Sequence, residues 1–430
     1  MVGIRGIAPR RVALVTAIVA AVIMGDSMIY NVLPANVSSF GVSVGLVGVL
    51  LSANRVVRLA ANPLAAWVVE RYGTSAPLMV SALVAIGTTA LLGVAKGFAL
   101  LLLARLLWGV CFSVFRISGY LIVLEESSDG SRGRLLGFFS GGQRLGSLVG
   151  VLLGGILFDV IGRSSSFLVI AALGFLSMPA ALALGRHTDS ATGPDSSDAN
   201  KGSQEPWAED LTGVRRLMWD LLVSRVPESA GRIRMRLLAV NFTFFSVHLV
   251  MSGLLVATLG FYLNQRLGEE ATVLGVVLGI ATVNGLLLAT RWASDVGSPY
   301  LGYMGDRWGQ ERIFVGAAPV CVITLLLLAS DGPLWLTLPW LPLTFLAMAS
   351  AITALTAMAG SLSPAHRRAQ VMSRFATWQD LGSALGPLLA FAVLSSVAPE
   401  PVYLGGAVFL AAALGFFVAV FRPRLVATRT

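Results

Sequence analysis

Charged side chains are scarce in this chain of 430 residues. Asp, Glu, Lys and Arg together make up 12% of the sequence, whereas hydrophobic residues make up 56% and the mean hydropathy is +0.80. A soluble domain carries about 25% charged residues, which cover its water-facing surface. The composition therefore excludes an ordinary soluble fold and favours a protein whose solvent is lipid.

Cysteine and histidine are also rare. The two cysteines, Cys111 and Cys321, fall within apolar runs and cannot form a disulfide framework. The three histidines, His187, His248 and His366, are scattered and form no zinc-binding cluster. The sequence also lacks a Gly-x-x-x-x-Gly-Lys loop for nucleotide phosphates and any nucleophile–base arrangement. We therefore expect no metal, no cofactor, no ATP-driven step and no enzyme activity.

Apolar runs of roughly 20 residues recur along the chain, and each can cross about 30 Å of hydrocarbon as an α-helix. We expect helices at 12–36, 43–69, 76–95, 98–121, 135–159, 165–185, 237–262, 272–297, 313–330, 335–360, 375–397 and 402–421. The first run is too long for the apolar core of a cleaved signal peptide, and no small-residue cleavage site follows it. The prediction is an all-α membrane protein that crosses the bilayer twelve times.

The basic residues are distributed unevenly between the two sides of these runs. Of the 31 Lys and Arg residues, six lie within the runs, three (Lys96, Arg163 and Arg266) fall on one side, and the other 22 fall on the side that holds both termini. This asymmetry follows the positive-inside rule, so we expect both termini in the cytoplasm and the protein in the inner or plasma membrane. The net charge of +9 thus reflects topology and does not indicate nucleic-acid binding.

A long polar segment separates the first six runs from the last six. Its first part, 187–206, is rich in Ser, Asp, Gly and Thr and is typical of a flexible linker. Its second part, 211–226, has apolar residues at helical spacing with interleaved arginines, as in a helix that lies on an anionic membrane surface, or simply in a spacer. We therefore divide the chain into a six-helix bundle at 1–185, a cytoplasmic linker with an amphipathic helix at 186–235, and a second bundle at 236–430.

The two halves are internal repeats with one constant offset of 236 residues. The residue pairs and segments that share this offset are Arg55 and Arg291, Pro63 and Pro299, Arg71 and Arg307, Gly73 and Gly309, and the segments 143–147 and 379–383. Halves with an even number of helices have the same orientation and are related by an axis along the membrane normal. Such halves can rock about a central site, which favours an alternating-access carrier over a pore.

Two related segments occur at equivalent places in the halves. The segment 302–309 reads Gly-Tyr-Met-Gly-Asp-Arg-Trp-Gly, and the segment 66–73 reads Ala-Trp-Val-Val-Glu-Arg-Tyr-Gly. Both resemble the Gly-x-x-x-Asp-Arg-x-Gly signature of the major facilitator superfamily, with Ala for Gly and Glu for Asp in the first copy. The resemblance implies a fold of two six-helix bundles related by a pseudo-twofold axis along the membrane normal.

This resemblance also implies gating residues. A short loop with an acid and an arginine at a helix junction can bridge the cytoplasmic ends of the two bundles when the inner gate closes. The residues expected in this role are Glu70, Arg71, Gly73, Asp306, Arg307 and Gly309.

Other segments resemble motifs of the family's exporters. Residues 105–109 match the Arg-x-x-x-Gly motif of helix four. Gly146, Gly150 and Gly154, and Gly382 and Gly386, follow a four-residue spacing that lets helix backbones approach closely. Residues 25–34 are similar to the Asp…Asn-Val-Ala-Leu-Pro motif of drug–proton antiporters, although the segment is one residue shorter.

Nine charged residues fall inside the predicted membrane helices. They are Asp26, Asp295, Asp380, Arg55, Arg58, Arg105, Arg116, Arg144 and Arg291. A charge near the bilayer centre costs several kcal/mol unless it is paired or faces a water-filled cavity. We therefore expect these groups to be functional, with a local excess of positive charge.

Two ion pairs are expected among these groups. Arg291 and Asp295 are four residues apart and can pair along one helix face. Arg144 and Asp380 occupy equivalent positions in helices five and eleven, and we expect an ion pair between the halves that breaks during rocking. Pairing of each group within its own half is the alternative.

Asp26 is the candidate for proton coupling. A medium of low dielectric constant favours the neutral form of a carboxylic acid, so such a group can take up and release a proton near neutral pH. Arg116 or Arg105 is the expected counter-ion. The alternative is a permanent Asp–Arg pair within the first half.

Arg55 and Arg291 are the candidates for substrate binding. They are related by the repeat, and two arginines from opposite halves can hold an anion bidentately. Nitrate carriers of the superfamily place arginines on the same two helices. Arg58 lies on the same helix face as Arg55 and can join them. The alternative is that these arginines pair with fixed acids such as Asp295.

The sequence thus predicts a secondary transporter of a small organic solute, coupled to protons and more consistent with efflux than with import. The expected cavity residues are Arg55, Arg58, Arg105, Arg116, Arg291 and Asn31. An anion-specific carrier and a non-transporting membrane sensor on the same fold remain alternatives. The expected partners are the solute, protons and lipid, with a functional monomer and no nucleic acid.

Overall fold

The computed structural model describes residues 8–127, 131–189, 231–273, 275–330, 332–363 and 368–427, and helices dominate this part of the chain. The elements of the first half are α1 (Arg10–Ala35), the short 3-10 helix η1 (Val37–Phe40), α2 (Val44–Tyr72), α3 (Ser75–Val94), α4 (Phe98–Glu125), α5 (Arg132–Phe175) and α6 (Met178–Asp189). The predicted amphipathic helix at 211–226 lies outside the described residues.

The second half begins with one long helix in three sections, α8 (Gly231–Val247), the π-helix η3 (His248–Leu255) and α9 (Val256–Leu267). The remaining elements are β1 (Glu270–Val273), β2 (Val276–Gly279), α10 (Ile280–Val296), α11 (Ser298–Trp308), α12 (Gln310–Ala329), α13 (Leu334–Thr337), α14 (Trp340–Leu362), α15 (Arg368–Leu394) and α16 (Pro399–Ala427).

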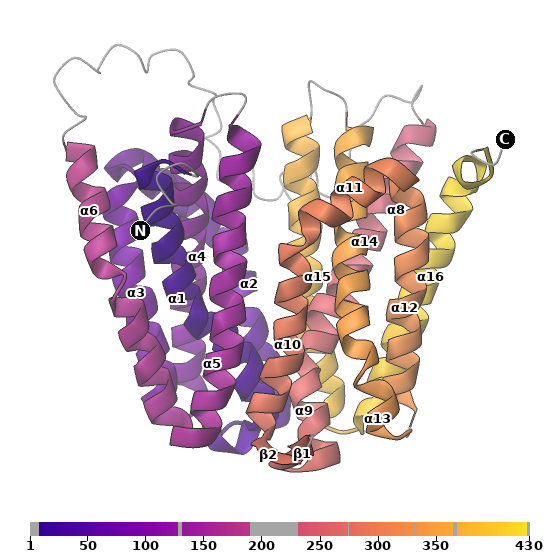
Figure 1. Cartoon of the computed structure of the whole chain (residues 1–430), viewed down its shortest axis with the longest axis horizontal. Coiled ribbons are helices and arrows are strands. Elements are labelled where there is room, and N and C mark those ends of the chain that lie inside the picture. The colour runs from indigo at the N-terminus through magenta and orange to yellow at the C-terminus, as the bar shows by residue number, and fades with distance from the viewer. Residues whose placement is uncertain are drawn as a thin grey trace.

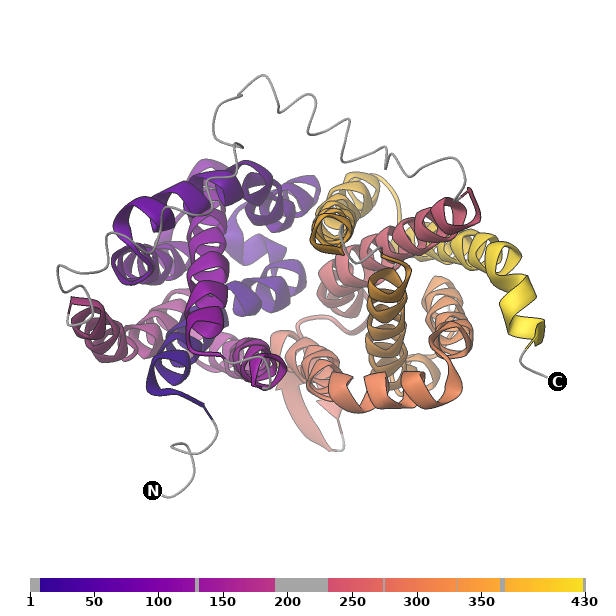
Figure 2. The same ribbon diagram turned by 90° about the horizontal axis from the view of Figure 1, so that it is seen from above.

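The helices form two bundles that stand side by side, one from each half of the chain (Figures 1 and 2). The bundles meet at the end that carries the hairpin β1–β2 and diverge toward the end where α1 begins and α16 ends (Figure 1). We call these the hairpin end and the terminal end. The predicted fold class, an all-α membrane protein of two six-helix bundles, is confirmed.

The sequence repeat also appears in the helix boundaries. A shift of 236 residues moves both bounds of α2 onto the first residue of α10 and the last residue of α11. The same shift moves the start of α4 onto the start of α13 and the start of α5 onto the start of α15. Across the bundles, α2 packs against α15 and α5 packs against α10, so the shift exchanges these two interfaces. The arrangement is that of a pseudo-twofold pair.

Nine stretches of the described helices are long and apolar enough to cross a membrane. One of them, 134–184, contains two crossings, because Gly162 adopts φ +74° and turns the chain inside α5. The sequence predicted a non-helical segment at 160–164 between these crossings. In the structure, a single glycine in the left-handed backbone conformation makes this turn. The helix at 235–267 is the most buried of the nine, and the one at 399–421 is the least buried.

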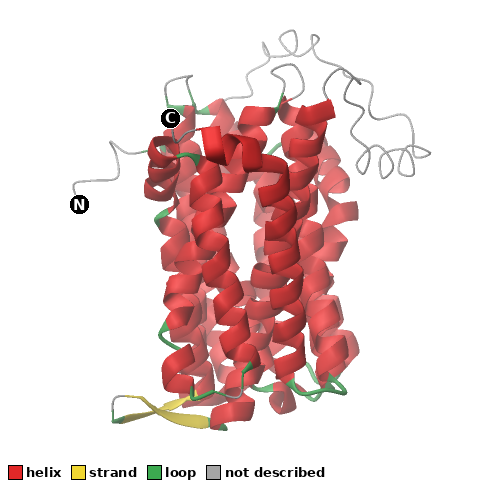
Figure 3. Cartoon of the chain, turned by 90° about the vertical axis from the view of Figure 1, so that its right-hand side faces the viewer, coloured by secondary structure: helices red, strands yellow, loops and turns green. Residues whose placement is uncertain are grey.

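Residues 272–279 were expected in a helix, and this prediction is wrong. They belong to an antiparallel hairpin in which Val273 pairs with Val276, and Gly275 adopts φ +83° in the turn (Figure 3). The stretch is apolar, which made it resemble the start of a membrane span. However, its β-branched residues favour strands, and a two-residue turn with glycine closes a hairpin.

The segment 302–309 was expected in a short loop, and this prediction is also wrong. The segment is helical as far as Trp308 and belongs to α11, which lies across the terminal end of the second bundle (Figures 1 and 2). Pro299 stands in the first turn, where its fixed φ suits a helix start. Gly309 adopts φ +93° and ends the helix.

Candidate functional site

A cavity of about 1110 Å³ lies between the two bundles. Its walls come from α1, α2, α4 and α5 of the first half and from η3, α10, α14 and α15 of the second. Eight of the nine charged residues predicted within the membrane line it: Asp26, Arg55, Arg58, Arg116, Arg144, Arg291, Asp295 and Asp380. The ninth, Arg105, is 1% exposed and lies behind Asp26. Of the six residues expected to line the cavity, Arg55, Arg58, Arg116 and Arg291 do so, whereas Arg105 and Asn31 do not.

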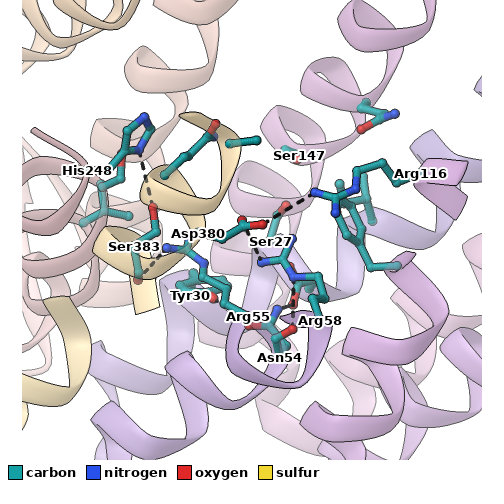
Figure 4. Close-up of a pocket in the computed structure, with 18 of the residues that line it drawn as sticks. Ser27, Tyr30, Asn54, Arg55, Arg58, Arg116, Ser147, His248, Asp380 and Ser383 are labelled. Carbon is teal, nitrogen blue, oxygen red and sulfur yellow. Dashed lines mark hydrogen bonds and ion pairs between the residues drawn. The ribbon is translucent and has the colours of Figure 1, made fainter. Parts of the chain in front are cut away.

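Asp380 joins the two halves through ion pairs (Figure 4). Its carboxylate lies 3.6 Å from Arg116 Nη1 of α4 and 4.0 Å from Arg58 Nη2 of α2. Arg58 also donates from Nε to the carbonyl of Asn54, at 3.0 Å, and lies over the ring of Phe112. These pairs are longer than an ideal charge-assisted hydrogen bond, and Asp380 is partly exposed to the cavity. Water can therefore reach the carboxylate.

Asp26 belongs to a tighter network within the first half. Its carboxylate accepts a hydrogen bond from Arg105 Nη1 and another, at 3.1 Å, from Asn54 Nδ2. Arg105 also donates from Nε to the carbonyl of Leu50. The hydroxyl of Tyr30 donates to the carbonyl of Leu51 at 2.7 Å. Of the two expected counter-ions, Arg105 pairs with Asp26, whereas Arg116 pairs with Asp380.

Arg55 reaches across to the opposite half without meeting an acid. Its Nη1 donates to the carbonyl of Ser383 on α15 at 2.7 Å (Figure 4). One turn earlier on α2, the hydroxyl of Ser52 donates to the carbonyl of Ala384 at 2.6 Å. The Arg55 guanidinium also lies 5.2 Å from the centre of the Tyr30 ring. One carbonyl bond leaves most of its N–H donors free for another partner.

Arg144 does not pair with Asp380, in contrast to the prediction. Its Nη1 donates to the backbone carbonyl of Asp295 in the last turn of α10 and, at 3.0 Å, to the hydroxyl of Ser298, the first residue of α11. The last carbonyls of a helix lack partners within the helix and carry partial negative charge, which attracts a cation. Arg144 thus does connect the halves, but through backbone, while Arg58 and Arg116 occupy Asp380.

Arg291 and Asp295 do not form the predicted ion pair. Among the described residues, neither side chain has an acid or base within 4.0 Å, although the two lie close enough for their charges to interact. Arg291 instead stacks over the ring of Trp292, with 4.3 Å between its Cζ and the ring centre. Its Nε is buried and has no hydrogen-bond partner in the described part of the chain.

Asn31 was expected to line the cavity, and the structure places it elsewhere. It is fully buried at the contact between the halves on the hairpin side of the cavity. Its Nδ2 donates to the carbonyls of Val151 and Ala281, and its own oxygens accept from Nδ2 of Asn284 at 2.9 and 3.1 Å. These amides bind the two halves together rather than facing a solute.

A second contact closes the same end of the molecule. Asp159 of α5 accepts hydrogen bonds from the backbone N–H of Thr282, at 2.7 Å, and from its hydroxyl, at 2.6 Å. Thr282 lies in the first turn of α10, whose own N-cap residue is Gly279 and offers no side chain. Asp159 therefore caps a helix of the opposite half. A side chain at 279 would collide with this carboxylate.

The predicted gating residues lie at the terminal end. Glu70, Arg71, Asp306 and Arg307 are exposed, and Asp306 accepts a hydrogen bond from Gln310 Nε2 at 2.9 Å. In the described part of the chain, none of the four forms an ion pair with the opposite half. This agrees with a conformation in which the bundles are apart at the terminal end.

Sequence reasoning missed the aromatic and polar groups of the cavity. These are Tyr30, Trp108, Phe112, Tyr120, Trp292, Trp378, Asn54, Ser383 and His248. His248 is buried and lies 3.4 Å from the Ser383 hydroxyl through Nδ1. A single intramembrane histidine beside Phe244 and Phe245 was a usable signal, since polar groups are rare at such positions. The aromatic residues gave no comparable signal because they occur in most of the membrane helices, whether or not they line the cavity.

Taken together, a charge-lined cavity between two repeated bundles that meet at one end is the arrangement expected of a membrane carrier. The sequence matches the Major Facilitator Superfamily at residues 15–296 and 292–429, which together span most of the chain. The chain belongs to this family. It is an integral, multi-pass membrane protein of a family of transporters.

Known transporters are similar to parts of this chain. The chromaffin granule amine transporter of Rattus norvegicus is 30% identical over 131 residues, which cover 30% of this chain and 25% of that protein. The vesicular acetylcholine transporter of Homo sapiens is 29% identical over 181 residues, covering 42% of this chain and 32% of that protein. The matched segments thus span only a quarter to a third of these relatives.

Solved structures share the fold over almost the full length. A bacterial homologue of the human lysosomal transporter Spinster, in an inward-facing and unoccupied conformation, has a TM-score of 0.66 at 16% identity and covers 96% of this chain and 95% of its own. A peptide transporter, POT, in complex with sulfate has a TM-score of 0.70 at 17% identity, covering 97% and 95%. At these identities the likeness concerns the fold alone.

Proposed function

We propose that this protein exports a small organic solute in exchange for protons, by alternating access of the central cavity. The observation that carries the proposal is the ion-paired Asp380, which binds arginines of the opposite half inside that cavity. A transporter that couples solute to protons needs an acid whose protonation changes how the halves interact. Asp380 meets this requirement, because its neutral form would release both Arg58 and Arg116.

Asp380 is a better candidate for the proton site than Asp26. Protonation of Asp26 would leave Arg105, which is almost fully buried, without its counter-charge, and an uncompensated buried charge costs several kcal/mol. Protonation of Asp380 frees Arg116, which is 29% exposed and can be solvated by water. It also frees Arg58, which is 10% exposed but keeps its hydrogen bond to the carbonyl of Asn54 and its contact with the Phe112 ring. Asp26 and Arg105 then act as a fixed pair that orients Tyr30 and Asn54.

The direction of transport follows from the proposed topology. With both termini in the cytoplasm, the terminal end is the cytoplasmic face, and the cavity extends toward residues near that end, such as Pro63 and Tyr120. A solute from the cytoplasm can then enter the cavity in this conformation. Export is supported by the resemblance of residues 25–34 and of the glycine motifs to exporters of the family.

The opposite conformation would require new contacts at the terminal end. We propose that Glu70 and Arg71 of α2 and Asp306 and Arg307 of α11 form these contacts when the bundles close there. The bundles at 1–185 and 236–430 would move as units, joined by the segment 186–235, and a single chain would suffice. The contacts of Asn31 and Asp159 at the hairpin end would break in the same step.

The test is proton movement in liposomes that contain the purified protein and an internal pH-sensitive dye. A panel of small organic anions, amines and neutral compounds is added from outside. We expect one chemical class to drive proton movement in the wild-type protein. Asp380→Asn, which imitates the protonated acid, should lose this movement by at least about tenfold while it retains exchange of labelled solute for unlabelled solute.

Glu269→Gln is the matched control, since Glu269 is exposed at the hairpin end, away from the cavity. Normal proton movement in Asp380→Asn would exclude Asp380 as the proton site. Solute uptake without any proton movement in the wild-type protein would exclude proton coupling and leave a uniporter.

A further inference from the structure

The charges that line the cavity do not balance. Five arginines and three aspartates line the cavity. The fixed ion pairs leave the excess positive charge on one group of arginines. Asp26 is occupied by Arg105, and Asp380 is occupied by Arg58 and Arg116. Asp295 forms no ion pair among the described residues, but it is a single charge. The remaining arginines, Arg55, Arg144 and Arg291, have no acid partner within 4.0 Å in the part of the chain that the structure describes.

These three arginines converge from both halves of the protein. Arg55 lies on α2, Arg144 on α5 and Arg291 on α10, and Arg291 is close enough to the other two for their charges to repel it. Arg55 and Arg144 use carbonyls of the opposite half, whereas Arg291 has no hydrogen bond in the described part of the chain. Like charges held together in a low-dielectric region are stabilised by an anion between them.

The rest of the wall combines aromatic and aliphatic side chains with uncharged polar groups such as Asn54 and Ser383. Trp292 lies directly under the Arg291 guanidinium, and Tyr30 lies under that of Arg55. Trp108, Phe112, Trp378 and Met348 add to the apolar surface of the cavity. A volume of about 1110 Å³ is at the upper limit of small-molecule pockets and is much larger than an inorganic anion requires.

We propose that the substrate is an aromatic organic anion, such as an arylalkyl carboxylate, whose charged group binds Arg291 and Arg55 while its ring packs on Trp292 and Tyr30. This assignment rests on the proposed transport function and specifies its substrate class. It differs from the amines that the names of the relatives indicate, because the unpaired charges of Arg55, Arg144 and Arg291 would repel a cation. It also excludes a bare inorganic anion, which would leave the aromatic wall uncovered.

Binding to the purified protein in detergent tests the assignment without any need for transport. Three probes share one ring and chain length and differ only in charge: 3-phenylpropionate, 3-phenylpropionamide and 3-phenylpropylamine. The readouts are the apparent unfolding temperature and tryptophan emission excited at a wavelength that the probes do not absorb. We expect a saturable response to the carboxylate alone, with no response to nitrate at equal concentration.

The variant that decides the question is Arg291→Gln, with Arg291→Lys beside it. Arg291 has no ion pair to lose, so the glutamine variant should fold and unfold normally without probe. It should bind the carboxylate at least about tenfold more weakly, because a charge-assisted bidentate contact is removed. The lysine variant keeps the charge and should lie between the two. Arg134→Gln, exposed on α5, is the control and should bind as the wild type does.

Several outcomes would overturn the assignment. They are an equal response to the amine, a response to nitrate equal to that of the carboxylate, the absence of any response to the three probes, and carboxylate binding unchanged in Arg291→Gln. Failure of the proposed function has a different signature. Carboxylate binding without transport in liposomes leaves this substrate assignment intact and excludes the transport proposal. Transport of the amine alone would support the transport proposal and exclude this substrate assignment.

Discussion

Arg105 and Asp26 show how a buried charge can be structural within a functional cavity. Both groups are predictable from the sequence as intramembrane charges, and the structure pairs them through a direct hydrogen bond with Asn54 as a second donor to Asp26. An arginine that is 1% exposed cannot find another partner without moving its helix. We therefore propose that the pair stabilises the first bundle and takes no part in the transport cycle.

This distinction leads to a prediction for single and double variants. Asp26→Asn should cost about 3–5 kcal/mol of stability, because it leaves a buried cation without its partner. The double variant Asp26→Asn with Arg105→Gln removes both charges and should recover most of that loss. Thermal unfolding of the detergent-solubilised protein provides the measurement.

Asn54→Ala serves as the comparison, since it removes one hydrogen bond to Asp26 and leaves the ion pair. Its cost should be about 1 kcal/mol. If the double variant recovers stability but loses substrate-dependent proton movement, Asp26 has the coupling role proposed above for Asp380.

The partners of individual residues were the part of the site that sequence could not provide. Helical spacing identified which charged residues lie within membrane helices. The repeat identified Arg55 and Arg291 as equivalent positions in the two halves. Arg144 and Asp380 are also equivalent by the repeat, yet they bind different groups. Equivalent positions on two bundles are not necessarily opposite one another, because the choice of partner depends on how the bundles are rotated and on which backbone groups are free.

At the scale of elements, glycines allow close helix packing both within one bundle and between the two bundles. A Cβ on Gly150 would lie 2.5 Å from the carbonyl of Met24, within the first bundle. A Cβ on Gly285 would lie 2.6 Å from the carbonyl of Val151, across the contact between the bundles. The first glycine allows α1 and α5 to pack in every conformation, whereas the second allows α5 and α10 to pack only while the hairpin end is closed.

We therefore expect alanine at these two positions to act differently. Gly150→Ala should lower the unfolding temperature, since overpacking a helix contact costs about 1–3 kcal/mol. Gly285→Ala should change stability less and should increase the population that is open at the hairpin end. Spin labels at Ser38 and Glu269, one in each half, report that opening as a longer distance.

Gly316→Ala is the control for both changes, because nothing lies within 4 Å of a Cβ at that position. It should alter neither stability nor the label distance. A Gly285→Ala protein with an unchanged distance distribution and a lower unfolding temperature would assign that glycine to general packing instead.

The elements themselves were largely predictable, and the two exceptions have physical causes. Hydropathy located the membrane helices because lipid imposes one length and one polarity on each crossing. It failed for the hairpin 270–279 and for α11, both of which lie at the ends of helices. At such places the chain can form a turn, a strand or a surface helix, and the apolar content of the segment does not distinguish these structures.

At the scale of the whole molecule, the charge asymmetry predicts which end faces each side of the membrane. The two arginines among the three basic residues expected outside are bound to backbone: Arg163 donates to the carbonyls of Leu92 and Ala95, and Arg266 donates to that of Gly332. These two arginines therefore hold loops in place, and we expect the basic residues at the terminal end to orient the chain.

The topology can be tested by labelling in intact cells. In a background with Cys111 and Cys321 replaced by alanine, a cysteine at Ser39 should react with a membrane-impermeant maleimide. A cysteine at Tyr72, which is exposed at the terminal end of α2, should react only after the cells are permeabilised. The reverse pattern would invert the molecule and would turn the proposed exporter into an importer.

The contact between the halves near the hairpin end has a consequence for the evolution of the sequence. Asn31, Ser52, Arg55 and Asn284 all cross this contact to reach backbone carbonyls, of Ala281, Ala384, Ser383 and Asn31 respectively. Where the acceptor is a backbone carbonyl, a substitution in the residue that supplies it leaves the acceptor in place, so a second mutation there does not compensate for loss of the donor. Ser52 and Arg55 should therefore be conserved individually among homologues, whereas Asn31 and Asn284, whose side chains also bind each other at 2.9 Å, should covary.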